Sequence, residues 1–70
     1  MVVIHLAEGF EEVEALTAAD ILRRAGKQVV LVSVTDDLLV TGAHNITVKA
    51  DCLFEEVDYA ACEMLVLPGG

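Results

Sequence analysis

The sequence predicts an α/β protein built on a parallel β-sheet, and two observations carry this prediction. Short apolar runs rich in β-branched residues flank an amphipathic stretch, which is the order of a strand–helix–strand unit. These apolar runs lack the polar alternation of half-exposed strands, so we expect strands that are covered on both faces. A hydrophobic content of 56% is enough to form a folded core.

The first strand and the helix are defined by the residues at their ends. Residues 2–7 (VVIHLA) form an apolar run that stops at an acidic residue and a glycine. Residues 11–25 carry acids in the first turn and two arginines in the last turn, and Gly26 follows directly. Charges in this order complement the helix dipole, and glycine supplies a C-cap. We therefore predict a strand over 2–7 and a helix over 11–25.

The next elements complete a βαβ unit and add a hairpin. Residues 28–34 are a second apolar strand, and the crossover from the first strand is expected to be right-handed. Residues 38–41 and 46–50 are short β-rich segments on either side of the loop sequence GAHN, which predicts a β-hairpin.

The final third of the chain predicts one more strand and leaves the sheet incompletely covered. Asp51 is placed to cap a short helical turn over residues 53–57, and residues 64–67 form a third apolar strand. A parallel sheet needs helices on both faces, and one long helix covers only one of them. We therefore expect residues 1–70 to be the N-terminal part of a single larger α/β domain, or one chain of a split domain.

Charge and cysteine content exclude several classes of protein. Twelve acidic and four basic side chains give a formal net charge of −8, which disfavours nucleic acids and anionic membrane surfaces as partners. No apolar run approaches the roughly 18 residues of a membrane helix, and the N-terminus does not resemble a signal peptide. Two cysteines are too few for a disulfide framework, and no Cys or His pair has zinc-finger spacing. We expect a soluble cytoplasmic protein without a structural metal.

Three glutamates lie near the start of the predicted helix, and helical geometry separates them. Glu14 lies at the head of an apolar stripe whose other members are Ala18, Ile21 and Ala25. Glu11 lies at the margin of this stripe, whereas Glu12 lies off it and is expected to be solvated. The Glu14 carboxyl is then either desolvated, so that it keeps its proton and donates a hydrogen bond, or simply one of the acids that favour a first helical turn.

Ligands of open α/β sheets bind beyond the carboxyl ends of the strands. After the first strand, a dinucleotide site would need three glycines, but only Gly9 is present and glutamates crowd the helix N-terminus. We therefore expect no nucleotide cofactor. After the last strand, Gly69 and Gly70 either present N–H groups to an anion, as in an oxyanion hole, or form an ordinary turn.

For the histidines and cysteines, the sequence predicts structural or exposed positions rather than catalytic roles. His5 lies inside an apolar strand and is expected to be a hydrogen-bonded core residue, whereas His44 is expected to be exposed in the hairpin loop. Cys52 and Cys62 do not form a Cys-x-x-Cys pair, and no base is predictably beside them. Both are expected to be small buried or edge residues rather than nucleophiles.

Three segments together resemble the ThiJ/PfpI family, also called DJ-one/PfpI. These are residues 7–14 (AEGFEEVE), residues 20–26 (DILRRAG) and residues 65–70 (LVLPGG), in this order around a βαβ unit with a hairpin. The resemblance spans the whole chain but covers only the first part of a family member. It implies a flavodoxin-like α/β sandwich, usually dimeric, that is related to the glutaminase domains of class I amidotransferases.

The resemblance also implies roles for individual residues. Members of the family have a reactive cysteine on a strand-to-helix elbow, which would follow Gly70 here, and neither cysteine of this chain has that position. Glu14 resembles the glutamate that stays protonated and hydrogen-bonds the cysteine thiolate. Gly69 and Gly70 resemble the glycines whose amides face the thiolate, and Arg24 resembles an arginine near the dimer interface of some members.

Two classes of function remain open. The first is a cysteine-dependent deglycase, glyoxalase or hydrolase that acts on small carbonyl or glycated substrates without a cofactor and protects against stress. The second is a non-catalytic redox-sensing or chaperone-like module of the same fold. A receiver-like signalling domain is a weaker third, because the last strand ends in Pro-Gly-Gly instead of an aspartate. In each case the expected partners are the rest of the domain and a second copy in a homodimer, and residues 1–70 alone lack a nucleophile.

Overall fold

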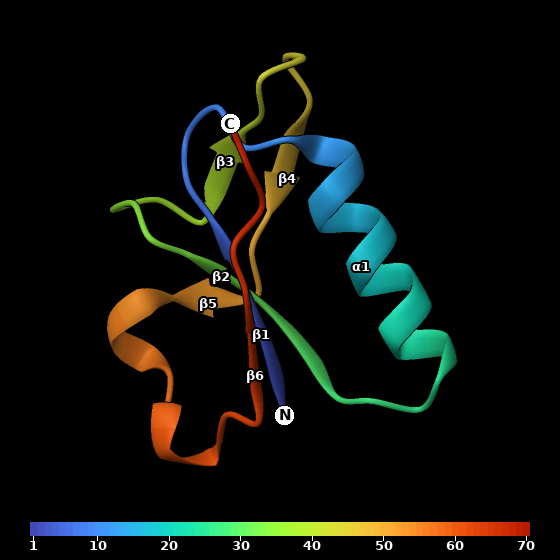
Figure 1. Cartoon of the computed structure of the whole chain (residues 1–70). Helices are drawn as coiled ribbons and strands as arrows, with labels where there is room; N and C mark the ends of the chain where they lie inside the picture. The colour runs from blue at the N-terminus through green and yellow to red at the C-terminus, as the bar shows by residue number, and fades with distance from the viewer.

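The computed structural model describes all residues from 1 to 70 and contains a four-stranded sheet, a two-stranded hairpin and one long helix (Figure 1). The elements in chain order are β1 (Val2–Leu6), α1 (Glu12–Arg24), β2 (Val29–Ser33), β3 (Leu39–Thr41), β4 (Thr47–Lys49), β5 (Cys52–Leu53), 3₁₀ turns at Phe54–Glu56 and Tyr59–Ala61, and β6 (Met64–Val66). The sheet order is β5-β2-β1-β6, and every neighbouring pair is parallel. The predicted α/β class and parallel sheet are confirmed.

Strand β1 is the centre of the sheet. It pairs with β2 from Val2↔Val29 to Leu6↔Ser33, and on its other side with β6, beginning at Val2↔Met64. The β1 residues that are completely buried are Val2, Val3, Ile4 and Leu6. A strand enclosed in this way must be apolar on both faces, which explains why its sequence shows no alternation.

Helix α1 and the β3–β4 hairpin cover the same face of the sheet. The buried cluster on this face includes Ile4 and Leu6 from β1, Ala15 and Ala19 from α1, and Val40 from β3. Figure 1 shows α1 along one side of the sheet, with the hairpin beside the N-terminal end of the helix.

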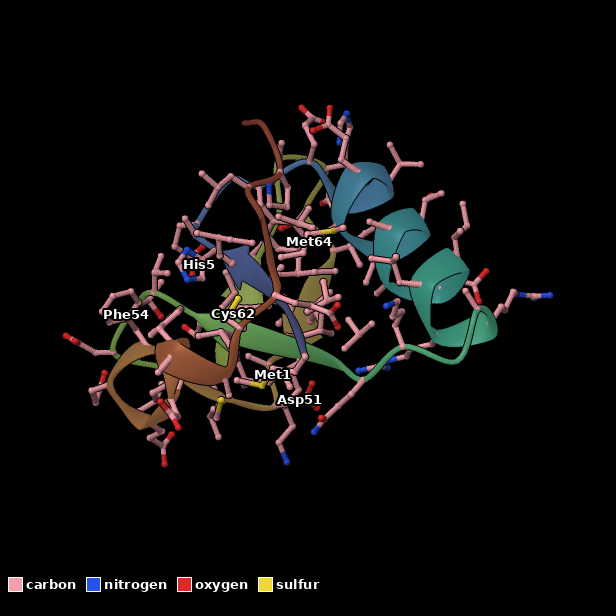
Figure 2. The ribbon with its side chains drawn as sticks, turned by 60° about the horizontal axis from the view of Figure 1, so that its bottom comes forward. Met1, His5, Asp51, Phe54, Cys62 and Met64 are labelled. Atoms are coloured by element: carbon pink, nitrogen blue, oxygen red, sulfur yellow. The ribbon has the colours of Figure 1, made fainter.

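The opposite face carries a small aromatic cluster. His5 of β1 is half-buried, and its Nε2 lies 2.8 Å from the Tyr59 hydroxyl, so the predicted hydrogen-bonded histidine is confirmed. Figure 2 shows His5 and Phe54 on the side of the sheet away from α1, and their ring centroids are 5.6 Å apart. Burial lowers the pKa of His5, which favours a neutral imidazole in this cluster. The two 3₁₀ turns contribute Phe54 and Tyr59 to this face, whereas α1 lies on the other face.

Helix α1 begins and ends within one residue of the predicted bounds. Its last turn is closed by two backbone hydrogen bonds, from Gly26 N–H to Arg23 O and from Lys27 N–H to Leu22 O. Gly26 has a φ of 83°, a left-handed conformation that permits this ending. The helix has 13 residues, and no helix of the protein has the length and apolar character needed to span a bilayer.

The predicted cap at Asp51 is wrong. Asp51 Oδ2 accepts a hydrogen bond from Leu31 N–H at 2.8 Å, and the Asp51 N–H donates to Leu31 O at 2.7 Å. Asp51 thus satisfies both backbone groups of Leu31 at the sheet edge, and the chain continues as the unpredicted strand β5. The following 3₁₀ turn begins only at Phe54, where the Glu56 carboxylate accepts from Leu53 N–H.

Isolated residues 1–70 are expected not to fold stably. Met64 and Leu65 of β6 are 49% and 47% exposed, and β6 has a sheet partner on one side only. Exposed apolar surface and an open strand edge favour association over a monomeric fold. Circular dichroism of the lone 70-residue chain should show no cooperative thermal transition. Such a transition in a monomeric sample would contradict this expectation.

Candidate functional site

The candidate site lies where the carboxyl ends of β1 and β6 meet the start of α1 (Figure 1). The connection from β1 to α1, residues 7–11, lies against the hairpin on one side. Gly9 N–H donates to Thr41 O at 2.8 Å, and Ala43 N–H donates to Phe10 O at 2.8 Å. The Phe10 side chain is buried in the core. The β1–α1 connection is therefore fixed to the hairpin by its main chain.

On its other side, the same connection is hydrogen-bonded to Gly69. Glu11 N–H donates to Gly69 O, and Gly69 N–H donates to Glu14 Oε1 at 2.8 Å. Both backbone polar groups of Gly69 are therefore bonded to the start of α1. Gly70 has a φ of 142°, and a Cβ at this position would collide with Gly9 O, so the close approach requires glycine.

The structure therefore brings together the site residues that the sequence placed on one edge. Glu14 and Gly69 are 55 positions apart in the chain and are directly hydrogen-bonded. Gly70 follows directly, and its N–H donates to no acceptor within the chain. Glu14 Oε2 also accepts no hydrogen bond within the chain. The edge thus offers one free amide and one free carboxylate oxygen.

The Glu14 side chain is exposed in residues 1–70, so its neighbours within this chain do not desolvate the carboxyl. Ile21, which was assigned to the same apolar stripe, is also exposed. The side of α1 that packs on the sheet is rotated by about one residue, and its members are Glu12, Ala15, Ala19 and the half-buried Leu22. In this setting of the helix, the Glu12 carboxylate is hydrogen-bonded to the hairpin loop.

Glu12 was expected to be solvated, and this prediction is also wrong: the residue is 4% exposed. Its Oε2 accepts from His44 N–H at 2.8 Å and from Ile46 N–H at 3.2 Å, and its Oε1 lies 3.1 Å from His44 Nδ1. Gly42 lies so close that a Cβ there would collide with the Glu12 side chain. The hairpin loop therefore encloses this carboxylate.

The electrostatics of Glu12 and His44 follow from these contacts. Burial alone would raise the pKa of Glu12, but hydrogen bonds from its own backbone, the His44 ring and the loop amides lower that pKa to about 2. The hydrogen bond to Glu12 and the negative charge of Glu11 raise the pKa of His44. His44 is exposed as predicted, yet it is also paired with two carboxylates.

Glu11, Glu12 and His44 also have the donor atoms for a cation, since one atom of each lies within 4.8 Å of the others. The Glu12 oxygens already accept hydrogen bonds from the loop, and His44 Nδ1 faces them at ion-pair distance. We therefore interpret this cluster as an ion pair.

The two cysteines and Arg24 lie in different surroundings. Burial and the nearby charges of Glu56 and Asp51 raise the pKa of the Cys52 thiol, the opposite of the shift that activates a nucleophile. The Cys62 thiol donates to Met64 O. The Arg24 side chain is exposed and pairs with Asp20, one turn earlier on α1.

Taken together, the fold and this edge define the class of protein. A parallel sheet with its central strand followed by a helix, and a polar site at the carboxyl ends of the strands, is part of a flavodoxin-like α/β fold.

Within that class, the chain belongs to the DJ-1/PfpI family, whose sequence model matches residues 1–70. The resemblance to this family that the three sequence motifs indicated is thereby confirmed.

Relatives of known structure and curated sequence agree with this assignment. The chain is 39% identical in sequence to protein DJ-1 homolog A of Arabidopsis thaliana, over 99% of this chain and 18% of that protein. A deglycase of Thermococcus kodakarensis is 38% identical over 99% of this chain and 41% of its own length. The oxidized Toxoplasma gondii DJ-1 structure superposes with a TM-score of 0.94 at 39% identity, over 99% of this chain and 38% of that one. The chain thus spans less than half the length of these relatives.

Gly42→Ala tests the enclosure of Glu12 by the hairpin loop. The added methyl group must displace the carboxylate, so we expect the free energy of unfolding to fall by about 1–3 kcal/mol. In a Glu12→Ala background the carboxylate is absent, so the added methyl group has space. There, Gly42→Ala should lower the free energy of unfolding by clearly less. Urea denaturation of the longer protein that carries residues 1–70, in its parent form, the two single variants and the double variant, measures the coupling. Equal costs in both backgrounds would contradict the contact.

Proposed function

We propose that residues 1–70 form the N-terminal part of a cysteine-dependent DJ-1/PfpI protein of the deglycase or glyoxalase type, whose nucleophilic cysteine follows Gly70. The hydrogen bond between Gly69 N–H and Glu14 carries this proposal, because it places a carboxyl and two glycine amides at one edge of the sheet. The names of the relatives support it, since several matched family members are deglycases. We propose small carbonyl or glycated groups as the substrates of this protein, as the family resemblance implies.

Two groups of this chain would serve the reaction of such a cysteine. Glu14 Oε2 is free within the chain and, when protonated, donates a hydrogen bond to the thiolate, which stabilises the negative charge on sulfur. The thiolate adds to the carbonyl carbon of the substrate, and the carbonyl oxygen becomes an alkoxide. The free N–H of Gly70 is a donor for this oxyanion. No cofactor is required for these steps.

A redox-sensing or chaperone-like role is the second candidate. A thiolate beside a hydrogen-bonding carboxyl is also prone to oxidation, and the matched Toxoplasma gondii DJ-1 structure is of an oxidized form. Turnover of methylglyoxal separates the two candidates, because an enzyme consumes it repeatedly whereas a sensor does not.

We further infer that the protein forms a homodimer through the outer side of α1 and the adjoining loop of the hairpin. A cavity of about 510 Å³ lies between them, and its apolar lining comes from Val13, Leu16 and Ile46. Val13 and Ile46 are 69% and 50% exposed. Asp20 also lines this cavity and pairs with Arg24, which puts Arg24 at its margin. A second copy would bury this apolar surface.

Substitutions of Glu14 test the proposed role in the longer protein that carries residues 1–70. Glu14→Gln keeps a hydrogen-bond donor and should largely preserve the reactivity of the cysteine. Glu14→Leu removes the donor and should raise the pKa of the thiol and slow its alkylation about tenfold. Iodoacetamide kinetics as a function of pH measure both quantities. Unchanged kinetics in Glu14→Leu would refute the role of Glu14.

Leu16→Asp tests the dimer. A charge inside the apolar cavity should shift the protein from dimer to monomer in size-exclusion chromatography with light scattering. Leu39→Asp is the matched control, because Leu39 is also exposed but does not line the cavity. Arg24→Ala should have a weaker effect in the same direction. A Leu16→Asp protein that remains dimeric would exclude this interface.

A further inference from the structure

We propose that Glu12 and His44 form a proton-dependent latch, which holds the hairpin loop on the first turn of α1 and thereby positions Glu14 and Gly69. Both are positioning residues, because neither is hydrogen-bonded to the Glu14–Gly69 pair itself. The chemical importance of that pair rests on the proposed function, whereas the latch rests on contacts within this chain.

The latch consists of one carboxylate that satisfies several groups of the hairpin loop. Glu12 is buried, and it binds the backbone amides of His44 and Ile46 as well as the His44 ring. The small size of Gly42 lets the carboxylate approach the loop. The ring itself is largely exposed, with a side-chain exposure of 70%. A buried carboxylate is thus paired with an imidazole that is open to solvent in the single chain, and the same ring lines the cavity that a second copy would cover in the proposed dimer.

The loop that Glu12 holds is directly connected to the candidate site. Ala43, next to His44, donates its N–H to Phe10 O in the β1–α1 connection. That connection continues to Glu11, whose N–H donates to Gly69 O, and Gly69 in turn donates to Glu14. A displacement of the loop would therefore shift the segment on which the Glu14–Gly69 hydrogen bond depends.

The charged groups around His44 fix the direction of the pH dependence. From α1 and its N-terminus, Glu11 Oε2 lies 3.7 Å and Glu12 Oε1 lies 3.1 Å from His44 Nδ1, and Asp20 lines the same cavity. The hairpin contributes no charged side chain between its strands, and Lys49 pairs with Leu39 at the opposite end of the hairpin. The one cation near this cavity, Arg24, is paired with Asp20. The two carboxylates that lie directly beside His44 favour its protonated form.

The two pKa shifts define a window in which the latch is strongest. The pKa of His44 is raised above its ordinary 6.5, so its contribution is complete below pH 6.5 and is lost as the pH rises through the folded-state pKa. The pKa of Glu12 is about 2 instead of 4.5, so its contribution is complete above pH 4.5 and is lost as the pH falls toward 2. The latch is therefore strongest between pH 4.5 and pH 6.5.

Nuclear magnetic resonance of the longer protein that carries residues 1–70 tests the latch. The His44 ring is titrated in the parent protein and in Glu12→Gln, and His44→Gln separates its signal from that of His5. We expect a His44 pKa above 6.5 in the parent protein and a lower one in Glu12→Gln. A pKa of 6.5 or less in the parent protein would overturn the proposal.

The amide proton of Gly69 reports the positioning step without any measurement of activity. Its chemical shift should follow the ionisation of His44 in the parent protein. In His44→Arg, which stays charged throughout, this dependence should disappear and the low-pH shift should be retained. If the chemical shift of the Gly69 amide proton does not change when His44 ionises, the positioning role is refuted. A different result would refute the proposed function, namely a reactivity of the cysteine thiol that does not depend on Glu14.

Discussion

The hydrogen bond from Gly69 N–H to Glu14 Oε1 joins the end of β6 to the first turn of α1, and the site depends on it. It forms only because β6 pairs in parallel with β1 and because the β1–α1 connection turns back over the ends of both strands. That connection is bonded to the hairpin on one side and to Gly69 on the other. The Gly69–Glu14 hydrogen bond therefore depends on the order of the strands, on where α1 begins and on the position of the hairpin.

Glu12 and Glu14, in the first turn of α1, have different roles at this edge. Glu12 is buried, and its carboxylate is fully engaged by the hairpin loop, so it contributes structure. Glu14 is exposed and keeps one carboxylate oxygen free, so it is available to a reacting group. A half-turn of helix separates these roles because residues 12 and 14 project in different directions from α1. This division is compatible with both functions that we propose for the DJ-1/PfpI chain.

Local sequence signals were sufficient for most of the fold. Apolar β-branched runs identified β1, β2 and β6, and charge order with Gly26 identified α1. The rule that ligands bind at the carboxyl ends of parallel strands placed the segments that carry Glu14 and Gly69 at the same edge of the sheet. The errors concern Asp51, Glu12 and the side of α1 that packs on the sheet. The carboxylates of Asp51 and Glu12 bind backbone amides 20 to 34 positions away. Such tertiary hydrogen bonds leave no periodic signal, although Glu12 does share its helical spacing with Ala15 and Ala19.

Native-state hydrogen exchange at the Gly69 amide tests the central contact most directly. In the longer protein that carries residues 1–70, the account predicts that this amide is protected, although it lies outside any strand, and that Glu14→Ala removes the protection without affecting the amides of β1. An amide of Gly69 that exchanges at the rate of an open loop in the parent protein, or that stays equally protected in Glu14→Ala, would contradict the account.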